Sequence, residues 1–149
     1  MGMNYSMRRK LKLALSLSYD ENGLYLNGKP YMLRGVGKHQ DYAKKGNAIS
    51  ISDIENDLDI ILRMGVNSIR ATHYQHADDF YSLCDEKGIL VWAEIPVISA
   101  INQSEEANLN AKEQLTYLIS QVRNHTCVYC YGVQNEVCMV TKNEYSFKL

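Results

Sequence analysis

Four short apolar runs alternate with three amphipathic helical patterns, and this alternation is the feature that most limits how the chain can fold. We predict strands in the runs 31–36, 66–72, 89–93 and 127–133. Helical spacing of apolar residues separates them, over about 53–64, 78–87 and 107–123. Apolar strands separated by helices are typical of a parallel sheet joined by right-handed crossovers, so we predict a parallel α/β fold whose strands are buried on both faces.

Local signals give the expected helix ends. Ser52 and Glu55 have the spacing of a capping box, which predicts that the first helix begins there. Gly65 and Gly88 stand where a glycine in the left-handed conformation usually ends a helix. Before the first predicted strand, turn sequences within 19–30 predict a short β-hairpin.

The periodicity leaves two architectures open. Four such strands could form a doubly wound sheet or one half of an eight-stranded (β/α) barrel. The glycine-rich phosphate loop of a nucleotide-binding sheet does not follow any of the predicted strands. This absence makes nucleotide binding a poor prediction and leaves the half-barrel as the fold that we expect.

Composition excludes several classes of function. The formal net charge is −1, which gives no general attraction to nucleic acid or to an anionic membrane. No apolar segment approaches the roughly 20 residues of a membrane span. Alternating leucines over 11–17 favour a strand there over a signal peptide, so we expect a cytoplasmic protein. Cys127 and Cys130 match a metal-binding spacing, but residues three apart in a strand face opposite sides, and we interpret them as buried apolar residues.

A polar group follows every one of the four predicted strands. These groups are His39, Arg70, His73, Glu94, Asn135 and Glu136. Because the carboxyl ends of parallel strands meet at one edge, we expect these side chains to converge, as catalytic groups do in (β/α) barrels. Amide, imidazole, guanidinium and carboxylate groups together suit a hydroxyl-rich ligand such as a sugar.

Several of these motifs together resemble the barrel domain of glycoside hydrolase family 2, over about residues 20–140. The matching segments, in the order and at the spacing of the family, are 27–36, 38–41, 64–74, 80–88, 91–96 and 124–136. The Trp92–Pro96 segment is most similar to the β-galactosidase type of the family. The resemblance implies residues 1–18 as an N-terminal extension and 19–149 as a partial glycoside hydrolase TIM-barrel domain.

The resemblance also implies roles for the polar residues. Glu136 matches the general acid/base of a retaining β-glycosidase, and Asn135 matches the residue that hydrogen-bonds the sugar 2-hydroxyl. The remaining matches are to the sugar-binding subsite and to a supporting carboxylate: His39, Arg70, His73 and Glu94. At a strand end Glu136 is expected to be partly buried, which would raise its pKa as a general acid needs.

Departures from the family pattern also shape the expectation. The acidic and histidine residues that bind magnesium in some members are absent around 97–100, so we predict no metal and no cofactor. Gly37-Lys38 replaces the usual Asn-Arg, and Gln75 stands where proline is common. The nucleophilic glutamate of the family lies on the seventh barrel strand. We expect the chain to stop before it, because Glu144 has no strand pattern around it.

Two hypotheses of function follow. The first is a β-galactosidase-like glycosidase whose isolated chain is inactive because it lacks the nucleophile. The second is a non-catalytic half-barrel that binds a carbohydrate or a partner chain through the same edge. In both cases unpaired strand edges favour association, so we expect a homo-oligomer. The preferred sugar and linkage do not follow from the sequence.

Overall fold

The computed structural model describes residues 16–102 and 104–137, in two compact units that divide after Tyr31. The first unit is an antiparallel sheet of β1 (Leu17–Asp20), β2 (Gly23–Leu26) and β3 (Lys29–Pro30). This sheet confirms the hairpin predicted within 19–30. The strand predicted over 11–17 falls mostly outside the described residues, as do the extension before residue 16 and Glu144.

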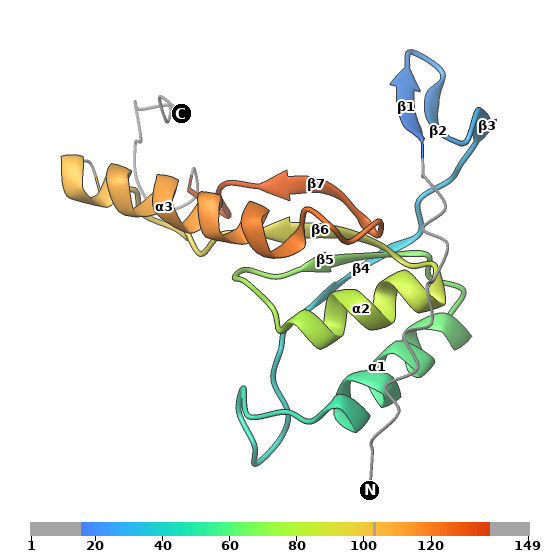
Figure 1. Cartoon of the computed structure of the whole chain (residues 1–149), viewed down its shortest axis with the longest axis horizontal. Coiled ribbons are helices and arrows are strands. Elements are labelled where there is room, and N and C mark those ends of the chain that lie inside the picture. The colour runs from blue at the N-terminus through green and yellow to red at the C-terminus, as the bar shows by residue number, and fades with distance from the viewer. Residues whose placement is uncertain (1–15, 103, 138–149) are drawn as a thin grey trace, which may run out of the picture. The chain divides into compact units, whose positions relative to one another are not determined.

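The second unit is a parallel sheet with its strands in chain order, β4-β5-β6-β7 (Figure 1). Its strands are β4 (Gly35–Lys38), β5 (Ser68–Ala71), β6 (Leu90–Glu94) and β7 (Val128–Gly132). The connecting helices are α1 (Ile51–Arg63), α2 (Asp78–Lys87) and α3 (Glu105–Val122). The first strand was predicted too early, at 31–36. Its ladder with β5 runs from Gly35 to Lys38, so the segment before Gly35 is a connection.

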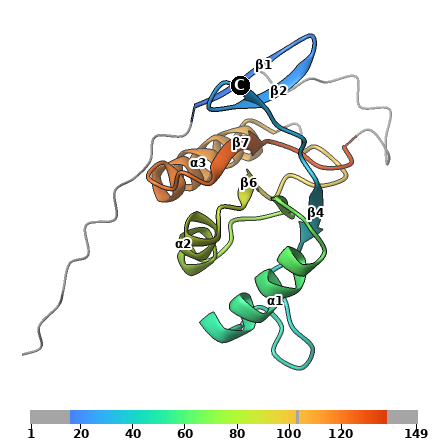
Figure 2. The same cartoon turned by 90° about the vertical axis from the view of Figure 1, so that its right-hand side faces the viewer.

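The three helices all cover the same face of the parallel sheet (Figure 2). Ile69 and Val91 point to that face and belong to the main core cluster. By the alternation of a strand, Arg70, Trp92 and Glu94 point to the other face. The residues on this face are also buried or half-buried, as predicted, with Ser68 and Leu90 each 4% exposed and Glu94 1% exposed. Crossover helices on one side only are the geometry of a barrel wall rather than of a doubly wound sheet.

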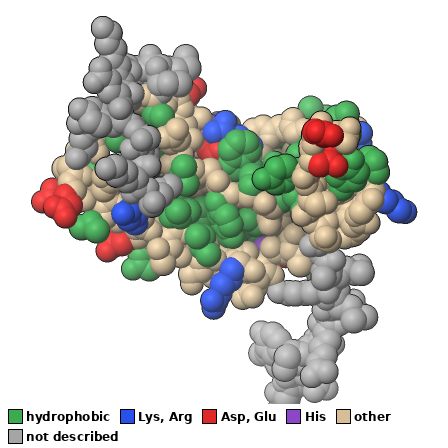
Figure 3. All heavy atoms as spheres, turned by 90° about the horizontal axis from the view of Figure 1, so that it is seen from above, with side chains coloured by type: hydrophobic (Ala, Val, Ile, Leu, Met, Phe, Trp, Pro, Cys, Tyr) green, Lys and Arg blue, Asp and Glu red, His purple; other side chains and the backbone are tan. Residues whose placement is uncertain are grey.

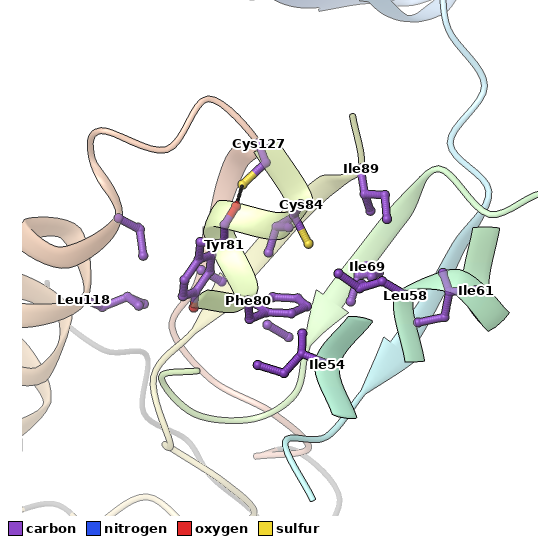
Figure 4. Close-up of a cluster of buried hydrophobic side chains, with 14 of the residues drawn as sticks. Ile54, Leu58, Ile61, Ile69, Phe80, Tyr81, Cys84, Ile89, Leu118 and Cys127 are labelled. Carbon is purple, nitrogen blue, oxygen red and sulfur yellow. Dashed lines mark hydrogen bonds between the residues drawn. The ribbon is translucent and has the colours of Figure 1, made fainter. Parts of the chain in front are cut away.

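The core lies between the sheet and the helices, where α1 and α2 contribute its largest side chains (Figure 4). Leu58, Phe80 and Tyr81 are at most 1% exposed. The buried side chains recur at helical spacing in the helices and at alternate positions in the strands. This spacing determines which face of each helix packs against the sheet. None of the helices within 16–102 and 104–137 is long and apolar enough to cross a membrane.

The helix ends agree with the sequence signals except at the start of α1. Ser50, not Ser52, is the N-cap: its hydroxyl accepts a hydrogen bond from the Asp53 amide, and the Asp53 carboxylate accepts one from the Ser50 amide at 2.8 Å. Asp53 completes the capping box with Ser50, whereas the sequence pattern predicted a box of Ser52 and Glu55. Gly65 and Gly88 have φ of 76° and 69°, the left-handed conformation expected after α1 and α2.

Candidate active site

The carboxyl ends of the four parallel strands meet at one edge of the sheet. In the strand registers Lys38 is paired with Ala71, Ala71 with Ala93, and Glu94 with Gly132. This alignment brings together side chains that are up to 65 residues apart in the sequence. The expected convergence of the polar groups at this edge is thus present, although not for every residue.

Glu94, at the end of β6, is the centre of the cluster. Its side chain is 1% exposed, and its two oxygens have different partners. Arg70 Nε donates a hydrogen bond to Oε1, and His73 Nδ1 lies 2.8 Å from Oε2. Because an ionised carboxylate only accepts, the His73 proton on this side must be on Nδ1. Burial of the Glu94 charge is offset by these charge-assisted contacts.

The same arginine connects Glu94 to Asn135. Arg70 Nη2 donates to Asn135 Oδ1 at 3.0 Å, and its guanidinium lies over the Trp92 ring, 5.0 Å from the centroid. The Asn135 backbone is held from the other side, since its N–H donates to the Val97 carbonyl at 2.8 Å. Asn135 is therefore fixed by both its side chain and its backbone, and it is buried.

Glu136 directly follows Asn135 but differs from the expectation in its environment. Its side chain is exposed, and its backbone is in the left-handed region with φ of 55°. The expected partial burial of Glu136 was wrong, because the left-handed backbone at 136 leaves its side chain exposed although its neighbours Asn135 and Val137 are buried. Glu136 is the neighbour of Asn135 in sequence, but its carboxyl group is not part of the hydrogen-bonded network around Glu94.

His39, beyond the end of β4, joins the cluster through ring contacts. Its exposed ring meets that of His73 edge-on, with centroids 5.4 Å apart, and lies 5.9 Å from the Tyr74 ring. The Tyr74 hydroxyl accepts a hydrogen bond from the Gln40 amide at 3.0 Å, which ties the loop after β4 to the loop after β5. Both histidines predicted for the site thus lie at the same edge.

Three residues of this region were not predicted as site residues from the sequence. Trp92 supports Arg70, and its position two residues before Glu94 on the same strand face was a signal that could have found it. Gly132 faces Glu94 across β6 and β7. A Cβ there would lie 2.6 Å from Glu94 Cγ and still closer to Trp92 Nε1, so the position has room for glycine alone.

The third is Lys38, whose side chain is 8% exposed. Its ammonium group contacts the Asp57 carboxylate of α1 at 2.5 Å and donates to the His39 carbonyl at 3.0 Å. A buried lysine requires such partners. The pair attaches the end of β4 to α1 and positions the His39 backbone, a long-range contact that no local sequence pattern indicates.

The cysteines of the predicted strand, Cys127 and Cys130, are free thiols. Cys127 belongs to the core cluster, whereas Cys130 is half-buried in register with Trp92. Burial raises the pKa of both thiols above the ordinary value. Such thiols are poor nucleophiles at neutral pH. The interpretation as a buried apolar residue is confirmed for Cys127, whereas Cys130 is only half-buried.

A wall of parallel strands, helices outside it and polar groups at the carboxyl edge define part of an enzyme domain of the TIM-barrel class. The chain belongs to the glycosyl hydrolases of family 2: residues 18–147 match the TIM barrel domain of that family.

Known relatives include enzymes of two specificities. The chain is 38% identical over 130 residues to a β-glucuronidase of Bacteroides fragilis, and 38% identical over 116 residues to a β-galactosidase of Thermoanaerobacter pseudethanolicus. These alignments cover 83% and 77% of this chain. A crystal structure of a Bacteroides uniformis β-glucuronidase matches 89% of the chain, with a TM-score of 0.82 and 34% identity.

The chain spans less than one fifth of the length of these relatives: 19% and 16% of the two enzymes, and 16% of the crystallised chain. The similarity therefore concerns one part of the barrel domain, which contains the first four strands of its wall.

Proposed function

We propose that this chain contributes one half of the active site of a retaining β-glycosidase, with Glu136 as the general acid/base. Asn135 would hydrogen-bond the sugar 2-hydroxyl, and His39, Arg70 and His73 would line the sugar-binding subsite. The observation that carries the proposal is the network in which Arg70 joins buried Glu94 to Asn135, since it holds the residue next to Glu136 in one orientation.

In such a reaction Glu136 would first protonate the leaving oxygen and then deprotonate the attacking water. Its exposed side chain is compatible with direct access to a substrate. Glu94 would have a supporting role, because both of its oxygens already accept from Arg70 and His73. For the same reason Glu94 is a poor base for an inverting reaction.

The proposal requires a second carboxylate as the nucleophile, about 5–5.5 Å from Glu136. We propose that none of the carboxylates of this chain occupies that position. The purified chain alone should therefore hydrolyse a chromogenic aryl β-galactoside no faster than buffer. Turnover that disappears in Glu136→Gln would contradict this and would require a nucleophile from a neighbouring copy.

The role of Glu136 can be tested by supplying the missing strands. The chain would be fused to the carboxyl-terminal half of the barrel of the Bacteroides fragilis β-glucuronidase, and both β-galactosides and β-glucuronides would be assayed. Glu136→Gln should lower kcat/KM by about 100-fold or more on substrates with poor leaving groups, and far less on activated aryl substrates. Equal losses on both substrate classes would instead indicate a structural role.

We propose first the class of substrate and then the sugar. A terminal β-glycoside follows from the family, and a β-galactoside is our first choice from the Trp92–Pro96 segment. β-Glucuronides are the second candidate, favoured by the names of several relatives. Comparing the two chromogenic substrates in the fusion decides between them.

The alternative is a non-catalytic half-barrel that binds a carbohydrate or partner chain. A fusion that folds, binds galactose and remains inactive with Glu136 intact would favour it. The cytoplasmic location, the division between residues 1–18 and 19–149, and the absence of a cofactor or catalytic metal stay predictions.

A further inference from the structure

A second cluster of chemically active side chains lies at the opposite end of the parallel sheet. Asp85 is near the end of α2, and His125 and Cys127 are in the segment that enters β7. A carboxylate oxygen, a ring nitrogen and the sulfur of these residues lie within 4.8 Å of one another. Cys127 is 2% exposed, whereas the side chains of Asp85 and His125 are 24% and 13% exposed, so the cluster can be reached from solvent on one side.

The histidine of this cluster has a carboxylate at each ring nitrogen. His125 Nδ1 is 2.8 Å from Asp85 Oδ2, and Nε2 is 3.3 Å from Asp78 Oδ1. A neutral imidazole carries one N–H and can donate to only one of them. With the proton on Nε2, where it faces Asp78, the Nδ1 lone pair is free to bind a cation that Asp85 Oδ2 holds from the other side.

The Asp85 carboxylate is already oriented for such a cation. Its Oδ1 atom accepts from the Cys127 amide at 2.7 Å and from the Thr126 hydroxyl at 3.0 Å. These bonds fix the carboxylate plane and direct Oδ2 toward His125. An Nε2–H held by Asp78 completes the outer carboxylate–histidine contact that commonly orients a metal-binding imidazole.

We propose that Asp85 Oδ2, His125 Nδ1 and Cys127 Sγ bind a zinc ion that stabilises the junction of α2 and β7. Sulfur, imidazole and carboxylate ligands suit Zn²⁺, with water as the fourth ligand of a tetrahedron. On binding, the Cys127 thiol gives its proton to water and its sulfur becomes a thiolate ligand. The hydrogen bond from Cys127 Sγ to the Tyr81 carbonyl, 3.5 Å long, is lost (Figure 4).

The site needs a small adjustment to accept the ion. Bonds of about 2.0–2.3 Å place tetrahedral ligand atoms about 3.4–3.8 Å apart. Asp85 Oδ2 and His125 Nδ1, now 2.8 Å apart, must therefore separate slightly, and Cys127 Sγ must adjust its place in a cluster that now lies within 4.8 Å. Small rotations of the His125 and Cys127 side chains supply these movements without a change in the strand. The proposal is independent of the glycosidase activity, because the cluster lies at the strand end opposite Glu94.

The test is metal binding by the purified whole chain, freed of metal with a chelator. Titration calorimetry with Zn²⁺ should give one ion per chain, and Co²⁺ should produce a thiolate-to-cobalt charge-transfer band. Cys127→Ser and Asp85→Asn should each weaken Zn²⁺ binding at least about tenfold. The matched control is the double variant Cys130→Ser/Cys138→Ser, which should retain both the affinity and the cobalt band.

If Cys127→Ser fails to fold, the double variant still tests the site. Its remaining thiols are Cys84 and Cys127, so a cobalt–thiolate band in this variant must come from one of these two residues. Absence of Zn²⁺ binding in the folded parent chain would overturn the proposal. Loss of binding in the double variant, or binding without a cobalt–thiolate band, would overturn it equally.

Discussion

At the scale of single residues, His76 combines deep burial with an incomplete set of hydrogen bonds. It is 2% exposed, its Nε2 lies 3.2 Å from the Thr72 carbonyl, and its ring stands between those of Tyr74 and Phe80. Its Nδ1 has no hydrogen-bond partner among the described residues. Burial lowers the pKa of His76 from 6.5 to about 4, so the ring is neutral at pH 7.

This pKa predicts that acid destabilises the fold through His76. An unfolded histidine takes up its proton near pH 6.5, whereas the folded one resists until about pH 4, so stability falls as pH falls across this interval. At pH 4.5 the loss should be about 2–3 kcal/mol relative to pH 7. Urea unfolding of the parent chain and of His76→Gln measures it, and the variant should lose that much less on acidification. An unchanged pH dependence in His76→Gln would contradict the prediction.

At the scale of elements, the start of α1 shows where local patterns mislead. Ser50 and Ser52 both have hydroxyls near the helix end, and their oxygens lie 2.8 Å apart. The hydroxyl of Ser50 reaches the Asp53 amide, and Lys45 further binds the Asp53 carboxylate at 2.7 Å. These contacts lower the pKa of Asp53 to about 2, so the box remains charged down to strongly acidic pH.

Substitution of the two serines separates the predicted cap from the observed one. Ser50→Ala should lower the free energy of unfolding by about 1 kcal/mol, because the Asp53 amide then has no side-chain acceptor. Ser52→Ala is the matched control and should cost clearly less. Urea unfolding at pH 7 measures both. A larger loss for Ser52→Ala would place the N-cap where the sequence pattern placed it.

The helices and the later strands could be predicted because their signals are local. The spacing of Ile54 and Leu58 defines a buried helix face, and Gly88 marks a helix end, whatever the rest of the chain does. The start of β4 and the partners of Glu94 could not be found in this way. They depend on strand register and on contacts such as Arg70 with Asn135, which join segments far apart in the sequence.

At the scale of the whole molecule, the parallel sheet has two edge strands, since β4 and β7 each pair with one neighbour within the described residues. Beside β4, a groove of about 290 Å³ is bordered by apolar residues that include Val36, Ile60 and Met64. Ile60 and Met64 are 49% and 65% exposed, and further apolar side chains stand among charged ones on the face shown in Figure 3. Open edges next to apolar surface favour association.

We therefore expect the purified chain to form homo-oligomers through this edge. Light scattering coupled to gel filtration should give a mass above that of one chain, and Ile60→Glu/Met64→Glu should shift the mass toward the monomer. Leu109→Glu, at an exposed position of α3, is the control and should leave the mass unchanged. A parent chain that stays monomeric at high concentration would refute the expectation.

The glycine at position 132 has a consequence for how this sequence can evolve. A side chain there would collide with Glu94 and Trp92, which are fixed in turn by Arg70. Any single substitution at 132 should therefore be removed by selection as long as Trp92 and Glu94 are unchanged. Change at 132 becomes accessible only after smaller residues have appeared at both 92 and 94, so the three codons should vary together among descendants of this gene.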